Sequence, residues 1–212
     1  MNKSHDFTNN IKKGDMKATQ INKHLMEENK VKATGIVRRI DDLGRVVVPK
    51  EIRRTLRIRE GDPLEIFTDR EGEIILKKYS PIGELGQFAK QYADSLAQTT
   101  GHIIAISDRD QFIAVAGSAK KDLISKSISH NLEEVIGERE SVIAGKEDKN
   151  FIKITNDDDG EYTYQVVWPI ISEGDAIGAV LILTKDPKQK FGDMEAKLAS
   201  TAAVFLGRQM EQ

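Results

Sequence analysis

The sequence predicts an α+β protein with two folded parts, a small β-rich module followed by a larger mixed α/β domain. Between residues 34 and 77, short runs rich in β-branched residues are separated by turns that contain Gly and Asp. After residue 82, apolar residues recur at three- and four-residue steps, which is typical of amphipathic helices, and runs that resemble strands lie between them. The chain has 212 residues, of which 39% are hydrophobic and 31% charged, as in globular proteins.

Several classes of protein are excluded by composition. The uncharged run from Tyr162 to Ser172 is far shorter than the roughly 18 apolar residues that span a bilayer, so we expect no membrane partner. Lys3, Asp6 and Lys12 lie where a signal peptide would be apolar, which predicts a cytoplasmic protein. Cysteine is absent and the four His have no metal-ligand spacing, so we expect neither disulfides nor a metal site.

The net charge of −2 conceals an asymmetry along the chain. Residues 1–82 hold 18 Lys and Arg against 13 Asp and Glu, whereas residues 83–212 hold 14 against 21. The first part is therefore the candidate for a polyanionic partner.

Residues 1–31 are polar and lack apolar periodicity, which predicts a mobile tail. Regular patterning begins at Val31, which is also the residue that an internal GTG start codon would spell. This raises the hypothesis that translation starts there, and the intact mass of the native protein would test it.

Residues 32–80 are predicted to form a ββαββ module. A strand at residues 35–37 and another at 46–48 flank an Asp-Asp-Leu-Gly turn, Pro49 suits the start of a helix, and this helix is expected from Lys50 to Arg57. After a break at Gly61-Asp62-Pro63, two strands surround a second turn, at Leu64–Thr68 and Glu73–Lys77.

A module of about fifty residues buries too little surface to fold without help from disulfides, metals or a partner chain. Because the sequence offers neither cysteine nor metal ligands, we expect a second copy of the chain to complete the module. The predicted partner is thus an intertwined homodimer, which also doubles the positive surface.

Residues 81–100 are predicted to form a connecting amphipathic helix, with Ile82, Leu85, Phe88, Tyr92 and Leu96 on one side. Two roles remain open for it. It either packs on the domain that follows or spans between subunits.

Residues 101–212 are predicted to be a mixed α/β domain that ends in a helix. We expect a hairpin at 103–107 and 112–116, helical spacing from Ile124 to Ile136, strands at 151–155, 162–169 and 176–184, and a final helix over 191–208.

The module contains seven arginines between residues 38 and 59. A guanidinium presents a rigid fork of donors that suits phosphate oxygens and guanine edges, and a lysine ammonium lacks this geometry. Acidic neighbours such as Asp41, Asp42 and Glu51 are numerous enough that a solvated surface of mixed charge explains the pattern equally well. The residue pattern alone leaves both interpretations open.

A resemblance distinguishes them. The stretch from Thr34 to Leu56 closely resembles the swapped-hairpin DNA-binding domain of AbrB-type transition-state regulators, and the likeness continues through Leu64-Glu65-Ile66 to Leu76–Tyr79. In that family two chains interleave their hairpins into one β-barrel that binds double-stranded DNA. Matching positions imply DNA contacts by Arg38, Arg45, Arg53 and Arg54, with Lys32 and Arg39 as weaker candidates.

The rest of the chain resembles a sporulation regulator of the same family. The matching segments are Ser80-Pro81-Ile82, Glu84-Leu85-Gly86, Ala114–Ser118, Pro169-Ile170, Ile177–Val180 and the ending Phe205–Gln212. This resemblance implies a GAF-like sensor domain flanked by helices, a homotetramer, and control of sporulation genes in the forespore by activation and repression. GAF domains often bind small molecules, but the sequence identifies no ligand or cofactor.

Two rival functions remain. Swapped-hairpin modules also occur in antitoxins, where an extended tail wraps a toxin, although about 130 patterned residues follow residue 82 here. The alternative is a small-molecule receptor that acts through the C-terminal domain. No catalytic residue is predicted, because the sequence contains no phosphate loop, GxGxxG or GxSxG motif.

Overall fold

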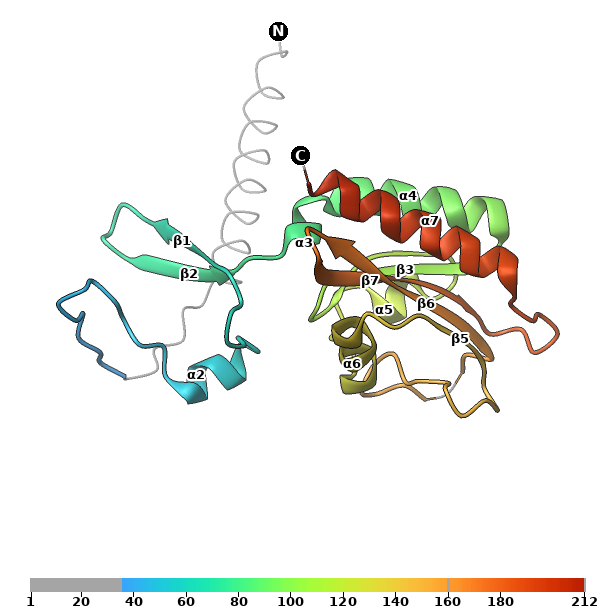
Figure 1. The fold of residues 1–212 in the computed structure, drawn as a ribbon, viewed down its shortest axis with the longest axis horizontal. Coiled ribbons are helices and arrows are strands. Elements are labelled where there is room, and N and C mark those ends of the chain that lie inside the picture. The colour runs from blue at the N-terminus through green and yellow to red at the C-terminus, as the bar shows by residue number, and fades with distance from the viewer. Residues whose placement is uncertain (1–35, 160, 212) are drawn as a thin grey trace, which may run out of the picture. The chain divides into compact units, whose positions relative to one another are not determined.

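The structure is a computed structural model that describes residues 36–159 and 161–211 (Figure 1). The predicted tail at residues 1–31 and the candidate Lys32 lie outside the described residues. The chain divides into two units, one ending at Lys50 and one running from Glu51 to Gln212, and each is described by itself. In the described ranges no helix combines the length and apolar character needed to cross a membrane.

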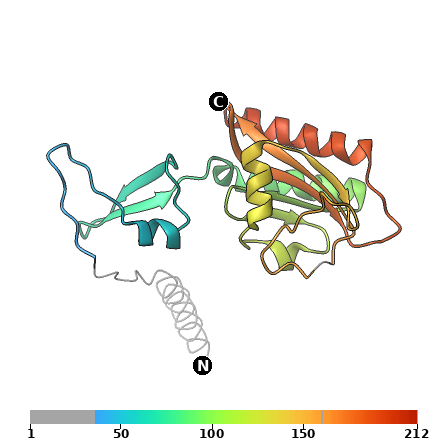
Figure 2. The ribbon, with the colours of Figure 1, turned by 60° about the horizontal axis from the view of Figure 1, so that its bottom comes forward.

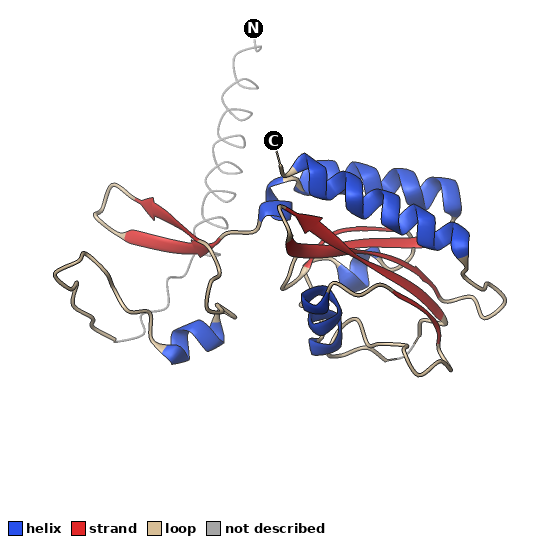
Figure 3. Ribbon diagram, viewed as in Figure 1, coloured by secondary structure: helices blue, strands red, loops and turns tan. Residues whose placement is uncertain are grey.

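In the first unit, residues 36–49 form a loop closed by a turn (Figure 3). The amide of Asp41 donates to the carbonyl of Arg45 at 3.0 Å, and the left-handed backbone of Gly44 (φ 77°) completes the turn. The turn was predicted correctly, but the strand pair around it was not, because residues 36–49 contain no strand. Val37 and Val47 are 88% and 72% exposed, so these apolar side chains have little to pack against within the described residues.

Helix α2 (Lys50–Thr55) begins at the last residue of the first unit, and the second unit continues with a hairpin of strands β1 (Leu64–Thr68) and β2 (Ile74–Lys78). The strands pair antiparallel from Leu64 opposite Lys78 to Thr68 opposite Ile74. Asp69 forms the turn by accepting from the amides of Glu71 and Glu73, each at 2.9 Å. These elements agree with the predicted helix and strands to within two residues.

The C-terminal part is built on a five-stranded antiparallel sheet in the order β4-β3-β7-β6-β5. Its strands are β3 (Ile103–Ser107), β4 (Phe112–Ala116), β5 (Val142–Gly145), β6 (Tyr164–Ser172) and β7 (Asp175–Thr184). Strands β6 and β7 are joined at Glu173 and Gly174, both with positive φ, as a tight two-residue hairpin requires.

Helices cover both faces of this sheet (Figures 1 and 2). Alternate residues of the central strands point to opposite faces, so Ile104 and Ile182 pack under α4 (Gly86–Thr100) and α7 (Asp193–Gln209). Ala105 and Leu181 face the other side, which α5 (Lys120–Leu123) and α6 (His130–Glu138) cover. Burial on both faces explains why the central strands are apolar throughout.

The connecting helix is two helices in the structure, α3 (Pro81–Glu84) and α4. The hydroxyl of Ser80 caps α3 by accepting from the amide of Gly83, and Ala89 and Ala93 of α4 are fully buried against the sheet. Of the two roles left open by the sequence, packing on the following domain is the one observed in the described chain.

Two predicted elements of this domain were wrong. The helical spacing from Ile124 to Ile136 is interrupted between α5 and α6, where Ser125 has a left-handed backbone (φ 61°) and Ser129 starts a new helix by capping the amide of Leu132. The predicted strand at 151–155 makes only one bridge, from Thr155 to Ile128. Strand β5, which was not predicted, pairs with β6 instead.

Candidate nucleic-acid interface

The turn at residues 41–45 fixes the orientation of Arg45. Asp41 accepts from the amides of Leu43 (3.1 Å) and Arg45 (2.8 Å), and its second carboxylate oxygen accepts from the Arg45 Nε at 2.8 Å. These hydrogen bonds from Arg45 hold the pKa of the Asp41 carboxyl below its usual value. The Arg45 side chain is 68% exposed, so the turn presents it to solvent with its other guanidinium nitrogens free to donate.

Arg38 and Arg39 lie in the same unit and are exposed. Neither has an ion pair within the described residues, which leaves both guanidinium groups available. Successive side chains of an extended segment point to opposite sides, so the two arginines cannot both address one surface from a regular strand.

The short helix α2 carries Arg53 and Arg54 in its last turn. Pro49 precedes the helix, and the Thr55 hydroxyl donates to the carbonyl of Glu51 at 2.9 Å. The helix ends because Arg57 takes a left-handed backbone (φ 52°) and the amide of Ile58 then donates to the carbonyl of Arg53 at 2.7 Å. This reversal places Arg57 close to Arg53 and Arg54.

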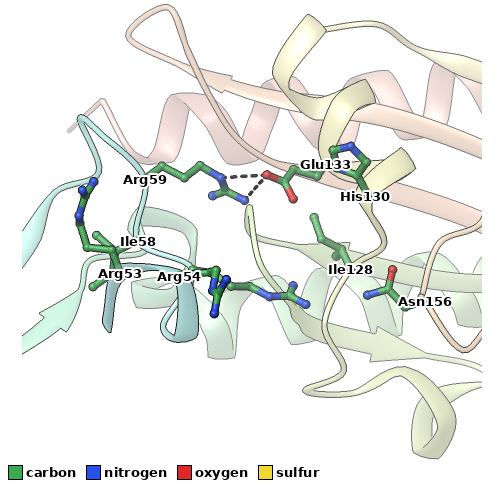
Figure 4. A pocket seen from close by; sticks show the side chains of 9 residues that line it. Arg53, Arg54, Ile58, Arg59, Ile128, His130, Glu133 and Asn156 are labelled. Carbon is green, nitrogen blue, oxygen red and sulfur yellow. Dashed lines mark hydrogen bonds and ion pairs between the residues drawn. The ribbon is translucent and has the colours of Figure 1, made fainter. Parts of the chain in front are cut away.

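Two further basic residues, Arg59 and Lys78, neither of them a predicted DNA contact, pair with carboxylates that lie far from them in the sequence. Arg59 donates to Glu133 from Nε at 2.9 Å and from Nη2 at 2.5 Å (Figure 4). Lys78 pairs with Asp62 at 2.9 Å and with Asp110 at 2.5 Å. The two residues of each pair are 16 to 74 positions apart in the chain, so no local sequence pattern predicts these ion pairs.

Asp62 is the most enclosed carboxylate of this network, with a side chain only 4% exposed. Burial acts to raise its pKa, but the hydrogen bond from the Arg59 amide at 2.8 Å and the charge of Lys78 outweigh burial and lower the pKa. Asp62 is therefore ionised at neutral pH and keeps Lys78 and the backbone of Arg59 in place.

The structure thus brings some predicted residues together and not others. Arg53 and Arg54 share one helical turn and line one cavity, which Arg57 and Arg59 also line. Arg38, Arg39 and Arg45 belong to the other unit, and Lys32 lies outside the described residues. No group of three or more His, Cys, Asp or Glu side chains among the described residues is arranged to hold a metal ion.

Both parts of the chain match known protein families. Residues 84–211 match the family model described as stage V sporulation protein T C-terminal, transcription factor, and residues 37–84 match the model described as antidote-toxin recognition MazE, bacterial antitoxin. Stage V sporulation protein T of Bacillus subtilis (strain 168) is 60% identical over 182 residues, covering 86% of this chain and 100% of that protein.

Two further similarities concern single parts of the chain. The transition state regulatory protein AbrB of Bacillus subtilis (strain 168) is 65% identical over 51 residues, which cover 24% of this chain and 52% of AbrB. The GAF domain of an Acinetobacter phosphoenolpyruvate-protein phosphotransferase is 13% identical with a TM-score of 0.47, covering 61% of this chain and 90% of that domain.

The predicted α+β fold class and the resemblance to AbrB-type regulators are confirmed. Stage V sporulation protein T, which is matched over its whole length, shows which group of these regulators the chain resembles. On this evidence the chain belongs to the stage V sporulation protein T family of transcription factors.

Proposed function

We propose that this transcription factor binds duplex DNA through the arginines of residues 38–54 and activates or represses sporulation genes from within the cytoplasm of the forespore. The observation that carries the proposal is a set of solvent-accessible arginines, of which only Arg45 has an ion pair among the described residues, on a segment 65% identical to part of AbrB. Arg38, Arg45, Arg53 and Arg54 supply the phosphate and base contacts, and Arg39 and Lys32 contribute more weakly. The function is one of binding, and no catalytic step is assigned to the chain.

The DNA-binding form we propose is a dimer with interleaved hairpins. The supporting observation is the number of apolar side chains that a single chain leaves in solvent: Ile36, Val37, Ile40, Leu43, Val46, Val47, Leu56, Ile66, Ile74 and Leu76 are each more than 40% exposed. So many exposed apolar residues within about forty positions mark a protein–protein surface. A second copy of the same segment is the occupant that suits it, because the AbrB-type hairpin pairs with itself.

A tetramer would follow if the C-terminal parts of two such dimers also associated. Phe205 of α7 is 38% exposed although it stacks on Tyr92 of α4 at 5.5 Å between ring centroids, and Val204 beside it is 50% exposed. This apolar stripe on the outer side of the helix pair supports a helix-mediated contact between dimers.

The antitoxin alternative rests on the family model that matches residues 37–84. The residues after this match form a folded sheet covered by helices on both faces, whereas a toxin-wrapping tail would be extended. Co-purification of a stoichiometric toxin would revive this alternative.

The decisive experiment is a fluorescence-anisotropy titration of the full chain on a sporulation promoter fragment at several salt concentrations. Wild type is expected to bind with a steep salt dependence, because each phosphate contact releases counterions. The double variant Arg53→Ala/Arg54→Ala should bind at least tenfold more weakly, while Arg70→Ala in the β1–β2 turn should match wild type. Equal binding by all three proteins, or none by wild type, would refute the proposal.

A further inference from the structure

Arg53 and Arg54 of α2 line a cavity that belongs to the same unit. Its volume is about 370 Å³, within the range of small-molecule sites. One wall carries Arg53, Arg54, Arg57, Ile58 and Arg59, and the other carries Ile128, His130, Glu133 and Asn156 (Figure 4). The cavity is therefore lined by residues close to the predicted DNA contacts and by residues of the C-terminal domain.

The charge of this cavity is strongly positive. Its one carboxylate, Glu133, is already engaged by Arg59, and Arg59 also lies 3.4 Å from Asp110. Arg53, Arg54 and Arg57 make no ion pair with any residue that the structure describes. Three arginines thus line one cavity without a counter-charge among the described residues, and their like charges repel one another until an anion enters.

The other lining groups narrow the class of anion. Guanidinium forks match the spacing of phosphate oxygens and donate two parallel hydrogen bonds to them. The Asn156 amide and the His130 ring add further hydrogen-bonding groups, while Ile58 and Ile128 offer apolar contact to a flat ring. A phosphate group attached to a small organic body satisfies all of these features, and a nucleoside diphosphate has a matching size.

We propose that this cavity binds a small phosphate-bearing ligand of the nucleotide class, and that the bound ligand competes with DNA for Arg53 and Arg54. The competition rests on the proposed DNA-binding function, whereas binding of the ligand itself does not. The effect is reciprocal: a ligand that lowers the affinity for DNA must have its own affinity lowered by DNA by the same factor. The cavity would thereby couple the C-terminal domain to the DNA contacts.

Isothermal titration calorimetry of the full chain with ADP, at constant ionic strength and without divalent metal, tests the site. Adenosine is the uncharged control, and pyrophosphate separates recognition of the phosphates from recognition of the nucleoside. We expect ADP to bind at least tenfold more tightly than adenosine. Pyrophosphate as tight as ADP would overturn the nucleotide class, because the site would then recognise phosphate alone, and absence of binding by both anions would overturn the site itself.

Two variants with matched controls locate the binding. Asn156→Asp places a carboxylate in the cavity at nearly unchanged volume, and Arg57→Gln removes one guanidinium. Each should weaken ADP binding roughly tenfold, the effect of one charge-assisted contact. Asn150→Asp and Arg70→Gln make the same chemical changes outside the cavity and should leave ADP affinity unaltered. Equal weakening by the controls would show non-specific attraction and overturn the assignment.

Competition is then measured by DNA anisotropy with and without ADP. The affinity of wild type for DNA should fall as ADP rises, and Asn156→Asp should require about tenfold more ADP for the same effect. If ADP binds and DNA binds but neither affects the other, the competition is refuted while both sites stand. If DNA fails to bind at all, the proposed function fails, and the calorimetric result for ADP is unaffected.

Discussion

Arg59 and Glu133 form a two-nitrogen contact to one carboxylate oxygen, at 2.9 Å from Nε and 2.5 Å from Nη2. Arg59 follows α2 by four residues, whereas Glu133 lies in the first turn of α6, 74 positions later. The contact ties the segment that carries Arg53 and Arg54 to a helix of the C-terminal domain. Any ligand that moves α6 would therefore bear on these arginines.

The first prediction concerns the strength of this tie. In a double-mutant cycle with Arg59→Ala and Glu133→Ala, we expect a coupling energy of about 0.5–1 kcal/mol, since both side chains are partly exposed, 26% and 34%, and solvent screens the pair. Urea unfolding at one fixed protein concentration measures it. Strictly additive effects would show that the ion pair contributes nothing to stability.

The second prediction follows from the lowered pKa of Asp62. A carboxyl whose folded pKa lies below its unfolded value stabilises the fold above the unfolded pKa, about 3.9, and loses that contribution as pH falls toward the folded pKa. Asp62→Asn should cost about 1–3 kcal/mol at pH 7, because Lys78 loses one of its two carboxylate partners, and less at pH 3.

Thermal unfolding of wild type and Asp62→Asn between pH 7 and pH 3 checks whether the stability difference between them becomes smaller as pH falls. Asp94→Asn is the control, because Asp94 is exposed on α4 and has no ion pair among the described residues. A difference between wild type and Asp62→Asn that stays constant across this range would mean that ionisation of Asp62 does not stabilise the fold.

The third prediction compares two helical glycines. A Cβ on Gly207 of α7 would lie 2.0 Å from the carbonyl oxygen of Ile171 in β6, whereas a Cβ on Gly137 of α6 would meet open space. Gly207→Ala should destabilise the domain by about 2 kcal/mol or more through overpacking. Gly137→Ala should stabilise it by about 0.5–1 kcal/mol, because Ala is the better helix former. The same sign of change in both variants, measured by thermal unfolding, would contradict the close approach of α7 to the sheet.

The elements that periodicity predicts well are those that one chain completes by itself. Strands β3 and β7 and helix α7 have long, consistent apolar patterns, and the structure has them within two residues of their expected bounds. The interrupted helix near Ser125 was missed because Ile124 and Ile128 fit helical spacing although the backbone reverses between them. Strand β5 was missed because four residues give too short a pattern.

The candidate site was predictable only in part. Arg53 and Arg54 became candidates through the resemblance to AbrB-type regulators, which matches residue types at their positions, and their DNA contacts stay a prediction. The partners of Arg59 and Lys78 depend on how distant segments pack, and no spacing in the sequence encodes that. The strands expected in residues 36–49 are absent for a third reason, since apolar side chains such as Val37 and Val47 are exposed among the described residues and, in the proposed dimer, would pair with a second chain.

The fourth prediction tests the proposed dimer. Val47→Asp places a charge on a side chain that is 72% exposed in one chain but would be buried between two. Burying an unpaired carboxylate is unfavourable, so the dissociation constant should rise at least roughly a hundredfold. Analytical ultracentrifugation should then report half the wild-type mass, and DNA binding should be lost. Lys149→Asp, a larger change of charge in an exposed loop, should leave the mass unchanged; if it dissociates the assembly equally, net charge and not the hairpin surface is responsible.

The last prediction separates the two kinds of contact that Arg45 is proposed to make. Arg45→Ala should lower DNA affinity about tenfold and reduce the slope of log affinity against log salt by about one unit, as expected for one lost phosphate contact. Arg45→Lys keeps the charge but cannot reproduce the fork, nor the Nε hydrogen bond to Asp41 that orients it. If Arg45 reads a base edge, Arg45→Lys should keep the salt slope and still lose about 1–3 kcal/mol on the specific site, with little loss on unrelated DNA. If Arg45 contacts only phosphate, Arg45→Lys should bind the specific site and unrelated DNA as wild type does. Unchanged affinity and salt slope in Arg45→Ala would show that Arg45 is not part of the interface.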